Sequence, residues 1–331
     1  MRVETRSKAA FFVSDAQAAP KGRDLLGASP LNYTGNKACI AQRLLDIMPE
    51  HDEYIEVFCG SAELLLCKEP CAREILNDYS GDVMNFWRVV RSDKLALLIG
   101  KIFLSVNGEA FFRENRELLR GRTNILDEYR DIALHIQTFT DEEVLAAAAF
   151  FETQFYSFSS TGTSFGVRGK NIVPKLRLLA AAHQRLQRVS LMCRDYRDVI
   201  ALYTGPRCLI FLDPPYVSTE NCYQKGNFGR DSHVELFRFL YDEVHVKFGG
   251  QCKFILTYND CPLVREQAAR YGFYLYTQDR LHNMAQQADP GSLFTEVIIT
   301  NYDAIEVMNS KAFLRSREME QLSLFDEGGG F

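Results

Sequence analysis

Residues 208–216 read CLIFLDPPY, an apolar run that ends on an acid, two prolines and an aromatic residue. A short run without polar positions is typical of a strand buried on both faces, as in a parallel sheet covered by helices. Further β-rich runs, separated by helical patterns, lie at 54–58, 73–78, 189–193, 252–259, 273–278 and 295–302. This alternation predicts an α/β fold on a doubly wound, mostly parallel sheet, whose last two strands are close enough in sequence to pair antiparallel.

The remaining segments divide the chain around this sheet. Residues 95–188 break the rhythm with charged helices and a Ser/Thr/Gly-rich segment, which predicts a helical insertion domain between the second and third strands. We therefore expect the sheet domain to comprise residues 31–94 and 189–305, and residues 306–331 to form a C-terminal tail. Residues 1–30 lack periodicity, so we interpret them as a flexible N-terminal arm rather than a signal peptide.

The composition is that of an ordinary globular protein, with 47% hydrophobic and 24% charged residues among 331. No stretch approaches the roughly 20 apolar residues that a membrane helix needs. Nine cysteines without a CxxC pair indicate reduced thiols rather than a zinc site, and we expect no metal. The net charge of −5 argues at first sight against a nucleic-acid partner, but residues 153–194 contain seven basic residues and no acid. Such local patches govern contacts with phosphate, although a solvated helix face is the alternative.

Functional residues of such a sheet are expected where its strands end. Gly60 lies in a small-residue turn after the first run, Asp78 ends the second run, and Asp213 ends the apolar run. The glycine lets a ligand approach the backbone closely, and an acid at the end of the second strand can accept hydrogen bonds from ribose hydroxyls. No GxGxxG or GxxxxGK motif is present, so neither a dinucleotide fingerprint nor a P-loop is indicated.

The DPPY sequence, Asp213 to Tyr216, indicates a chemistry of its own. Its prolines remove two backbone donors, fix φ and leave their carbonyl groups free as acceptors. A carboxylate, a stiff turn with exposed carbonyl oxygens and an aromatic ring can accept both hydrogens of an exocyclic amine and stack on its base. A plain strand-ending turn is the alternative, because Asp-Pro is common in turns.

Several motifs resemble, in the same order, those of the Dam-type family of DNA adenine N6-methyltransferases. They are YTGNK (33–37), YIEVFCGSAELLL (54–66), EILNDYSGDVMNFWRVVR (74–91), CRDYRDVI (193–200), DPPY (213–216), DSHVELFRFL (231–240), KFILTYND (253–260) and FTEVIITNY (294–302). The resemblance implies a Rossmann-like methyltransferase fold, with S-adenosyl-L-methionine as the cofactor. It implies that the cofactor-binding residues are Tyr33, Lys37, Glu56, Phe58, Gly60, Asp78, Asp195, Tyr196 and Asp213.

The resemblance also implies a mechanism in which the target adenine is flipped out of double-stranded DNA. Its catalytic residues would be Asp213, Pro214, Pro215 and Tyr216. Asp213 and the Pro214 carbonyl would accept hydrogen bonds from N6, and Tyr216 would stack on the base. The insertion corresponds to the family's target-recognition region, in which the DNA-binding candidates are Arg168, Lys170 and Lys175. Because this segment departs from that of GATC readers, the recognition sequence is left open, as is a restriction partner.

The tail contains QLSLF, which resembles the peptide by which bacterial replication proteins bind the sliding clamp. The candidate contacts are Gln321, Leu322, Leu324 and Phe325, and a helix end packed on the core is the alternative. We expect the protein to be cytoplasmic and bacterial or phage-encoded. Two other functions stay open: an N6-type methyltransferase acting on RNA or a protein amide, and a DNA-binding module of the same fold without activity.

Overall fold

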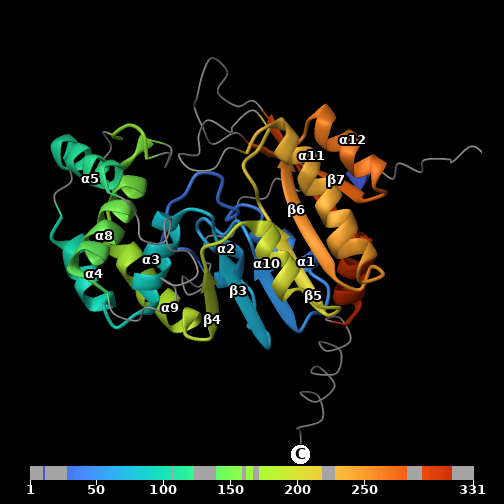
Figure 1. The fold of residues 1–331 in the computed structure, drawn as a ribbon, viewed down its shortest axis with the longest axis horizontal. Coiled ribbons are helices and arrows are strands. Elements are labelled where there is room, and N and C mark those ends of the chain that lie inside the picture. Colours follow the sequence, from blue (N-terminus) through green and yellow to red (C-terminus); the bar gives the residue numbers. More distant parts are fainter. Residues whose placement is uncertain are drawn as a thin grey trace, which may run out of the picture.

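The computed structural model describes residues 10–11, 28–105, 108–122, 139–158, 162–166, 171–217, 228–281 and 293–314. They form one eight-stranded sheet with the order β1-β7-β8-β6-β5-β2-β3-β4 (Figure 1). The strands are β1 (Ala10–Phe11), β2 (Glu53–Glu56), β3 (Arg73–Asn77), β4 (Val189–Met192), β5 (Cys208–Leu212), β6 (Lys253–Asn259), β7 (Tyr274–Leu281) and β8 (Leu293–Thr300).

The sheet is mixed, and its parallel part contains a switch point. Strands β2 to β6 pair in parallel, whereas β8 pairs antiparallel with both β6 and β7. From β2 the chain builds outward through β3 and β4, and from β5 it builds in the opposite direction through β6. β2 and β5 are therefore the adjacent strands from which connections diverge, which is where doubly wound folds bind ligands. The predicted α/β fold with an antiparallel final pair is confirmed.

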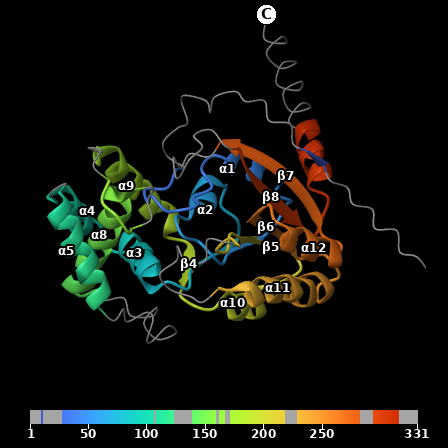
Figure 2. The same ribbon diagram turned by 90° about the horizontal axis from the view of Figure 1, so that it is seen from above.

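Helices cover both faces of this sheet, as Figure 2 shows. α1 (Ala41–Ile47) and α2 (Glu63–Cys67) lie on one face, and α10 (Tyr196–Tyr203), α11 (Arg230–Phe239), the π-helical η4 (Leu240–Val246) and α12 (Pro262–Arg270) lie on the other. Along β5, Leu209 and Phe211 join one hydrophobic cluster, and Ile210 and Leu212 join the cluster on the opposite face. Burial on both faces explains why this strand carries no polar residue. A further helix spans residues 304–314.

The insertion contributes α4 (Leu95–Phe103), α5 (Glu109–Gly121), α8 (Asp141–Tyr156) and α9 (Val173–Leu186) between β3 and β4. These helices gather on one side of the molecule, beside α3 (Gly81–Arg91) (Figure 1). α8 begins at a capping box formed by Thr140 and Glu143. The rings of Phe86 on α3 and Phe151 on α8 stack with centroids 5.9 Å apart, and both are fully buried. The insertion therefore shares its hydrophobic core with the first helices of the sheet domain.

The N-terminal arm differs from the expected flexible segment at two places. Ala10 and Phe11 add a short parallel strand to β7, a pairing too brief to leave a period in the sequence. Ser29 is buried, and its hydroxyl donates to the carbonyl of Ser61 at 2.6 Å. None of the helices in the described ranges is long and apolar enough to cross a bilayer.

Candidate active site

A cavity of about 550 Å³ opens at the carboxyl ends of β2, β3 and β5. All nine cofactor-binding candidates from the sequence line it: Tyr33, Lys37, Glu56, Phe58, Gly60, Asp78, Asp195, Tyr196 and Asp213. Pro215 also lines the cavity, whereas Pro214 is buried behind it. Segments far apart in the sequence thus meet at the switch point, as the strand-end argument predicts.

The turn after β2 depends on Gly60. Its φ is +43°, and a Cβ there would lie 2.8 Å from Cδ1 of Tyr33, so any larger residue would both strain the backbone and displace that ring. The Gly60 amide donates to Oδ2 of Asp78 at 3.0 Å, and its carbonyl accepts from Nε1 of Trp87 at 2.9 Å. The turn is therefore held in a shape that brings backbone against the cavity.

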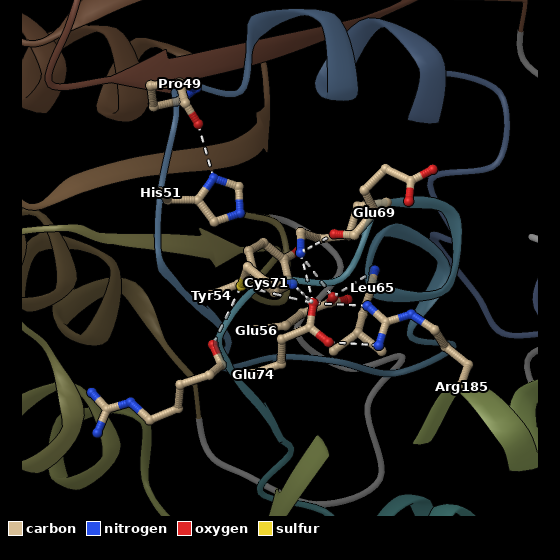
Figure 3. A network of polar contacts seen from close by, with 11 residues as sticks. Pro49, His51, Tyr54, Glu56, Leu65, Glu69, Cys71, Glu74 and Arg185 are labelled. Atoms are coloured by element: carbon tan, nitrogen blue, oxygen red, sulfur yellow. Dashed lines mark hydrogen bonds and ion pairs between the residues drawn. The ribbon is translucent and has the colours of Figure 1, made fainter. Parts of the chain in front are cut away.

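Glu56, the last residue of β2, carries a buried carboxyl group at the cavity wall. Its Oε2 accepts from the Tyr54 hydroxyl at 3.0 Å and from the Leu65 amide at 3.1 Å (Figure 3). Burial raises the pKa of Glu56 to about 8, and the nearby Asp213 adds to this shift. Glu56 is therefore mostly protonated at neutral pH in the absence of a cation in the cavity.

Asp78 follows β3 and faces the cavity with a fixed orientation. Its Oδ1 accepts from the Ser80 amide at 2.9 Å, and its Oδ2 accepts from Gly60. A carboxylate oriented by two amides at the end of the second strand retains further lone pairs that a pair of ribose hydroxyls can use.

Three aromatic rings form a cluster at the cavity wall. The centroid of Phe58 lies 5.4 Å from that of Tyr196 and 5.9 Å from that of Phe228, which also lines the cavity. Sequence reasoning missed Phe228, because it lies in a loop just before α11 and no periodicity marks it. Asp195 caps α10, and both of its oxygens accept from Arg197, at 2.8 and 3.0 Å.

Asp213 lies in a network of buried charges. Its Oδ2 accepts from Nζ of Lys37 at 2.5 Å, and its Oδ1 accepts from the Thr257 hydroxyl at 2.7 Å. Burial raises the pKa of Asp213 and Lys37 opposes this shift, while Glu296 adds to it. Nζ of Lys37 lies 3.5 Å from Oε1 of Glu296, so a buried carboxyl group and the partly exposed one of Asp213 share one lysine.

Tyr216 reaches the same network from outside the cavity wall. Its hydroxyl donates to Oε1 of Glu296, and Nζ of Lys37 lies 5.2 Å from its ring centroid. The ring also packs against Tyr258, at a centroid distance of 5.8 Å. Glu296 lies in β8, and sequence reasoning did not single it out, although it belongs to the quoted segment FTEVIITNY.

Of the three DNA-binding candidates from the sequence, the structure describes only Lys175. Arg168 and Lys170 lie outside the described residues. Lys175 donates from Nζ to the Ser29 carbonyl at 3.0 Å, and burial lowers its pKa. Arg185, from the same acid-free stretch, forms a bidentate pair with the buried Glu74 at 2.5 and 2.7 Å (Figure 3). Part of the basic stretch therefore serves packing between the insertion and the sheet domain.

A doubly wound, eight-stranded mixed sheet that brings the acid at the end of β3 and Asp213 of the DPPY turn to one cavity is the architecture of a Rossmann-like methyltransferase. The model of the D12 class N6 adenine-specific DNA methyltransferase family matches residues 33–310, and the chain belongs to this family. It is therefore an enzyme that transfers a methyl group from S-adenosylmethionine to N6 of adenine in DNA. The comparison with curated proteins gave no match.

Proposed function

We propose that S-adenosylmethionine and the target adenine meet in this cavity. The nine candidate residues that line it would each bind a different part of these molecules. The proposal rests on one observation, the convergence of all nine candidates, Asp213 among them, in a single cavity. Asp78 would bind the ribose hydroxyls, and the cluster of Phe58, Tyr196 and Phe228 would pack against the cofactor's adenine. Glu56 would face the cationic end of the cofactor.

The residues present fit a cationic cofactor. Near the cavity floor, the buried carboxyl groups of Glu56 and Glu296 and the partly exposed one of Asp213 stand against the ammonium of Lys37. A buried excess of acid is costly and is relieved by a bound cation or by protonation. When bound, S-adenosylmethionine supplies an electrophilic methyl group on a positively charged sulfonium.

Asp213 and the Pro214 carbonyl would bind the N6 amino group of the flipped adenine. Lys37 and Thr257 fix both oxygens of Asp213, so its remaining lone pairs keep one direction while N6 reacts. Accepting hydrogen bonds from N6 increases electron density on the nitrogen and stabilises positive charge as it develops there. The contribution of these groups is positioning and electrostatics, and no covalent enzyme intermediate is needed.

The test is methylation of DNA of mixed sequence by the purified enzyme, read by sequencing that reports modified bases. The proposal expects N6-methyladenine in one sequence context, and loss of the signal with Asp213→Asn. Activity of that variant near the wild-type rate would show that another group binds N6. Cofactor affinity, measured without DNA, should fall in Asp78→Ala and stay unchanged in Asp260→Ala, whose acid pairs with Arg265 outside the cavity.

We also propose that the tail docks the enzyme on a replication sliding clamp, which would place it in the cytoplasm with replicating DNA. The support is the QLSLF sequence, residues 321–325, which lies outside the described residues. Leu322, Leu324 and Phe325 would enter apolar pockets, and Gln321 would supply a hydrogen-bonding group. A short peptide that becomes ordered on binding gives roughly micromolar affinity.

A further inference from the structure

Helix α5 of the insertion brings two arginines to the cavity wall, and the residue that caps its C-terminal end adds a third. Arg116, Arg120 and Arg122 line the same cavity as Asp78 and Asp213, together with Leu119 of that helix. Arg116 and Arg120 are four residues apart and so share one helix face. The cofactor site and the DPPY turn need none of these arginines.

The three guanidinium groups are not neutralised within the described part of the chain. Arg113, on the same helix, forms an ion pair with Glu109 at 2.6 Å, but no carboxylate among the described residues pairs with Arg116, Arg120 or Arg122. NH1 of Arg122 is buried and has no hydrogen-bond partner in the part of the chain that the structure describes. Burial lowers the pKa of Arg116, and the positive charge of Arg120 adds to this effect. Positive charge that finds no carboxylate partner among the described residues, partly buried at Arg116 and Arg122 and exposed at Arg120, favours an anionic ligand at this wall of the cavity.

Buried contacts hold the helix that carries these arginines. Nδ2 of Asn115 donates to Oε2 of Glu152 on α8 at 2.7 Å, and both residues are buried. Phe112, one turn before Arg116, is buried as well and packs against Phe165 at a centroid distance of 5.7 Å. The arginine face is therefore presented to the cavity from a rigid helix rather than from a loop.

We propose that Arg116, Arg120 and Arg122 bind the phosphodiester backbone of the target strand next to the flipped adenine. Guanidinium groups pair bidentately with phosphate oxygens, and several in a row match the repeated charge of a DNA strand. The carboxylate of the cofactor is the other anion within reach. It carries one charge and adjoins two cationic groups of the same molecule, so three arginines exceed what it can neutralise. The inference rests on DNA as the substrate, which family membership provides.

The test compares the double variant Arg116→Ala/Arg120→Ala with the matched control Arg113→Ala, taken from the paired arginine of the same helix. Binding of a fluorescein-labelled duplex is followed by anisotropy over a series of salt concentrations. Loss of two phosphate contacts should reduce the slope of log K against log salt by about 1.8 and weaken binding about tenfold or more. The control and the double variant should bind S-adenosylmethionine like the wild type in calorimetry without DNA.

The results distinguish three roles for the arginines: binding of DNA phosphate, binding of the cofactor carboxylate, and exposure to solvent. A raised dissociation constant for S-adenosylmethionine with an unchanged salt slope would overturn the proposal and assign the arginines to the cofactor carboxylate. If neither the salt slope nor the dissociation constant for S-adenosylmethionine changes, the proposal is wrong and this face is a solvated surface. Arg116→Lys/Arg120→Lys keeps the charge, so it should retain the slope while losing part of the affinity. Melting curves of all variants establish that α5 is folded, and DNA methylation of the Asp213→Asn variant tests the function separately.

Discussion

Nζ of Lys37 lies 2.5 Å from Oδ2 of Asp213, although 176 residues separate them in the chain. The lysine comes from the segment before α1, and the acid comes from the end of β5. Lys37 also donates to the Gly35 carbonyl at 2.6 Å, which fixes its ammonium group from the other side. The N-terminal cofactor segment and the DPPY turn therefore meet through this ion pair and through the contact of Lys37 with the ring of Tyr216.

The first prediction concerns the negative charge of Asp213, which this ion pair holds in place. Asp213→Asn keeps the size of the side chain but weakens the acceptor that faces N6, so the rate of methyl transfer should fall about a hundredfold or more. Single-turnover kinetics with saturating cofactor and DNA measure this step. The matched control Asp260→Asn, in an exposed pair with Arg265, should keep the wild-type rate.

The second prediction concerns Glu296, which we expect to position Tyr216 and Lys37. Glu296 raises the pKa of Asp213 through repulsion, so Glu296→Gln should lower that pKa. The acid limb of the pH profile of kcat should then move to lower pH. An acid limb that stays in place, or moves to higher pH, would contradict this role. Tyr216→Phe removes only the hydroxyl and should leave the limb unchanged.

The third prediction is proton release from Glu56, whose pKa is raised to about 8 by burial. Between about pH 5 and 8, Glu56 should lose its proton when the cationic cofactor binds. Cofactor affinity should therefore rise with pH up to about 8 and then level off. Calorimetry in buffers of different ionisation enthalpy counts the protons released. Glu56→Gln should release none, and equal release from both proteins would assign the proton to another group.

A fourth prediction concerns stability, through Glu152 between α5 and α8. Burial raises the pKa of Glu152 to about 7, against the opposing hydrogen bond from Asn115. A raised pKa in the folded state means that the contribution of Glu152 to stability is complete below about pH 4.5 and is lost as pH rises through about 7. The loss amounts to at most about 3 kcal/mol. Denaturant unfolding at several pH values should show this slope in the wild type and not in Glu152→Gln.

The fifth prediction tests the tail. A chain that ends at Glu320 should methylate short duplexes at the wild-type rate but should not bind a purified bacterial sliding clamp. A labelled peptide with the sequence of residues 315–331 should bind the clamp with a roughly micromolar dissociation constant. Substitution of Leu324 and Phe325 by alanine in that peptide is the control. No binding of the unaltered peptide at about a hundredfold higher concentration would exclude this docking.

The sequence was sufficient for features that depend on local pattern. The apolar run that ends at Asp213 and the acid at Asp78 located two strand ends, and family motifs added the other cavity residues. Pairings between distant residues leave no such trace. Neither the hydrogen bond from Tyr216 to Glu296 nor the one from Lys175 to the Ser29 carbonyl follows from the spacing of residues in the sequence, because each depends on how the layers pack.

The stacking of Phe86 on Phe151 has a consequence for changing the target of this enzyme. Recognition regions are attractive units for exchange between relatives, since a new region could bring a new sequence preference. Exchange of the insertion, which the sequence predicts to be the recognition region, would separate two halves of one core and leave Phe86 of α3 without Phe150 and Phe151 of α8. Retargeting should therefore proceed through substitutions on the surface of the cavity, with the packed face of α8 kept as it is.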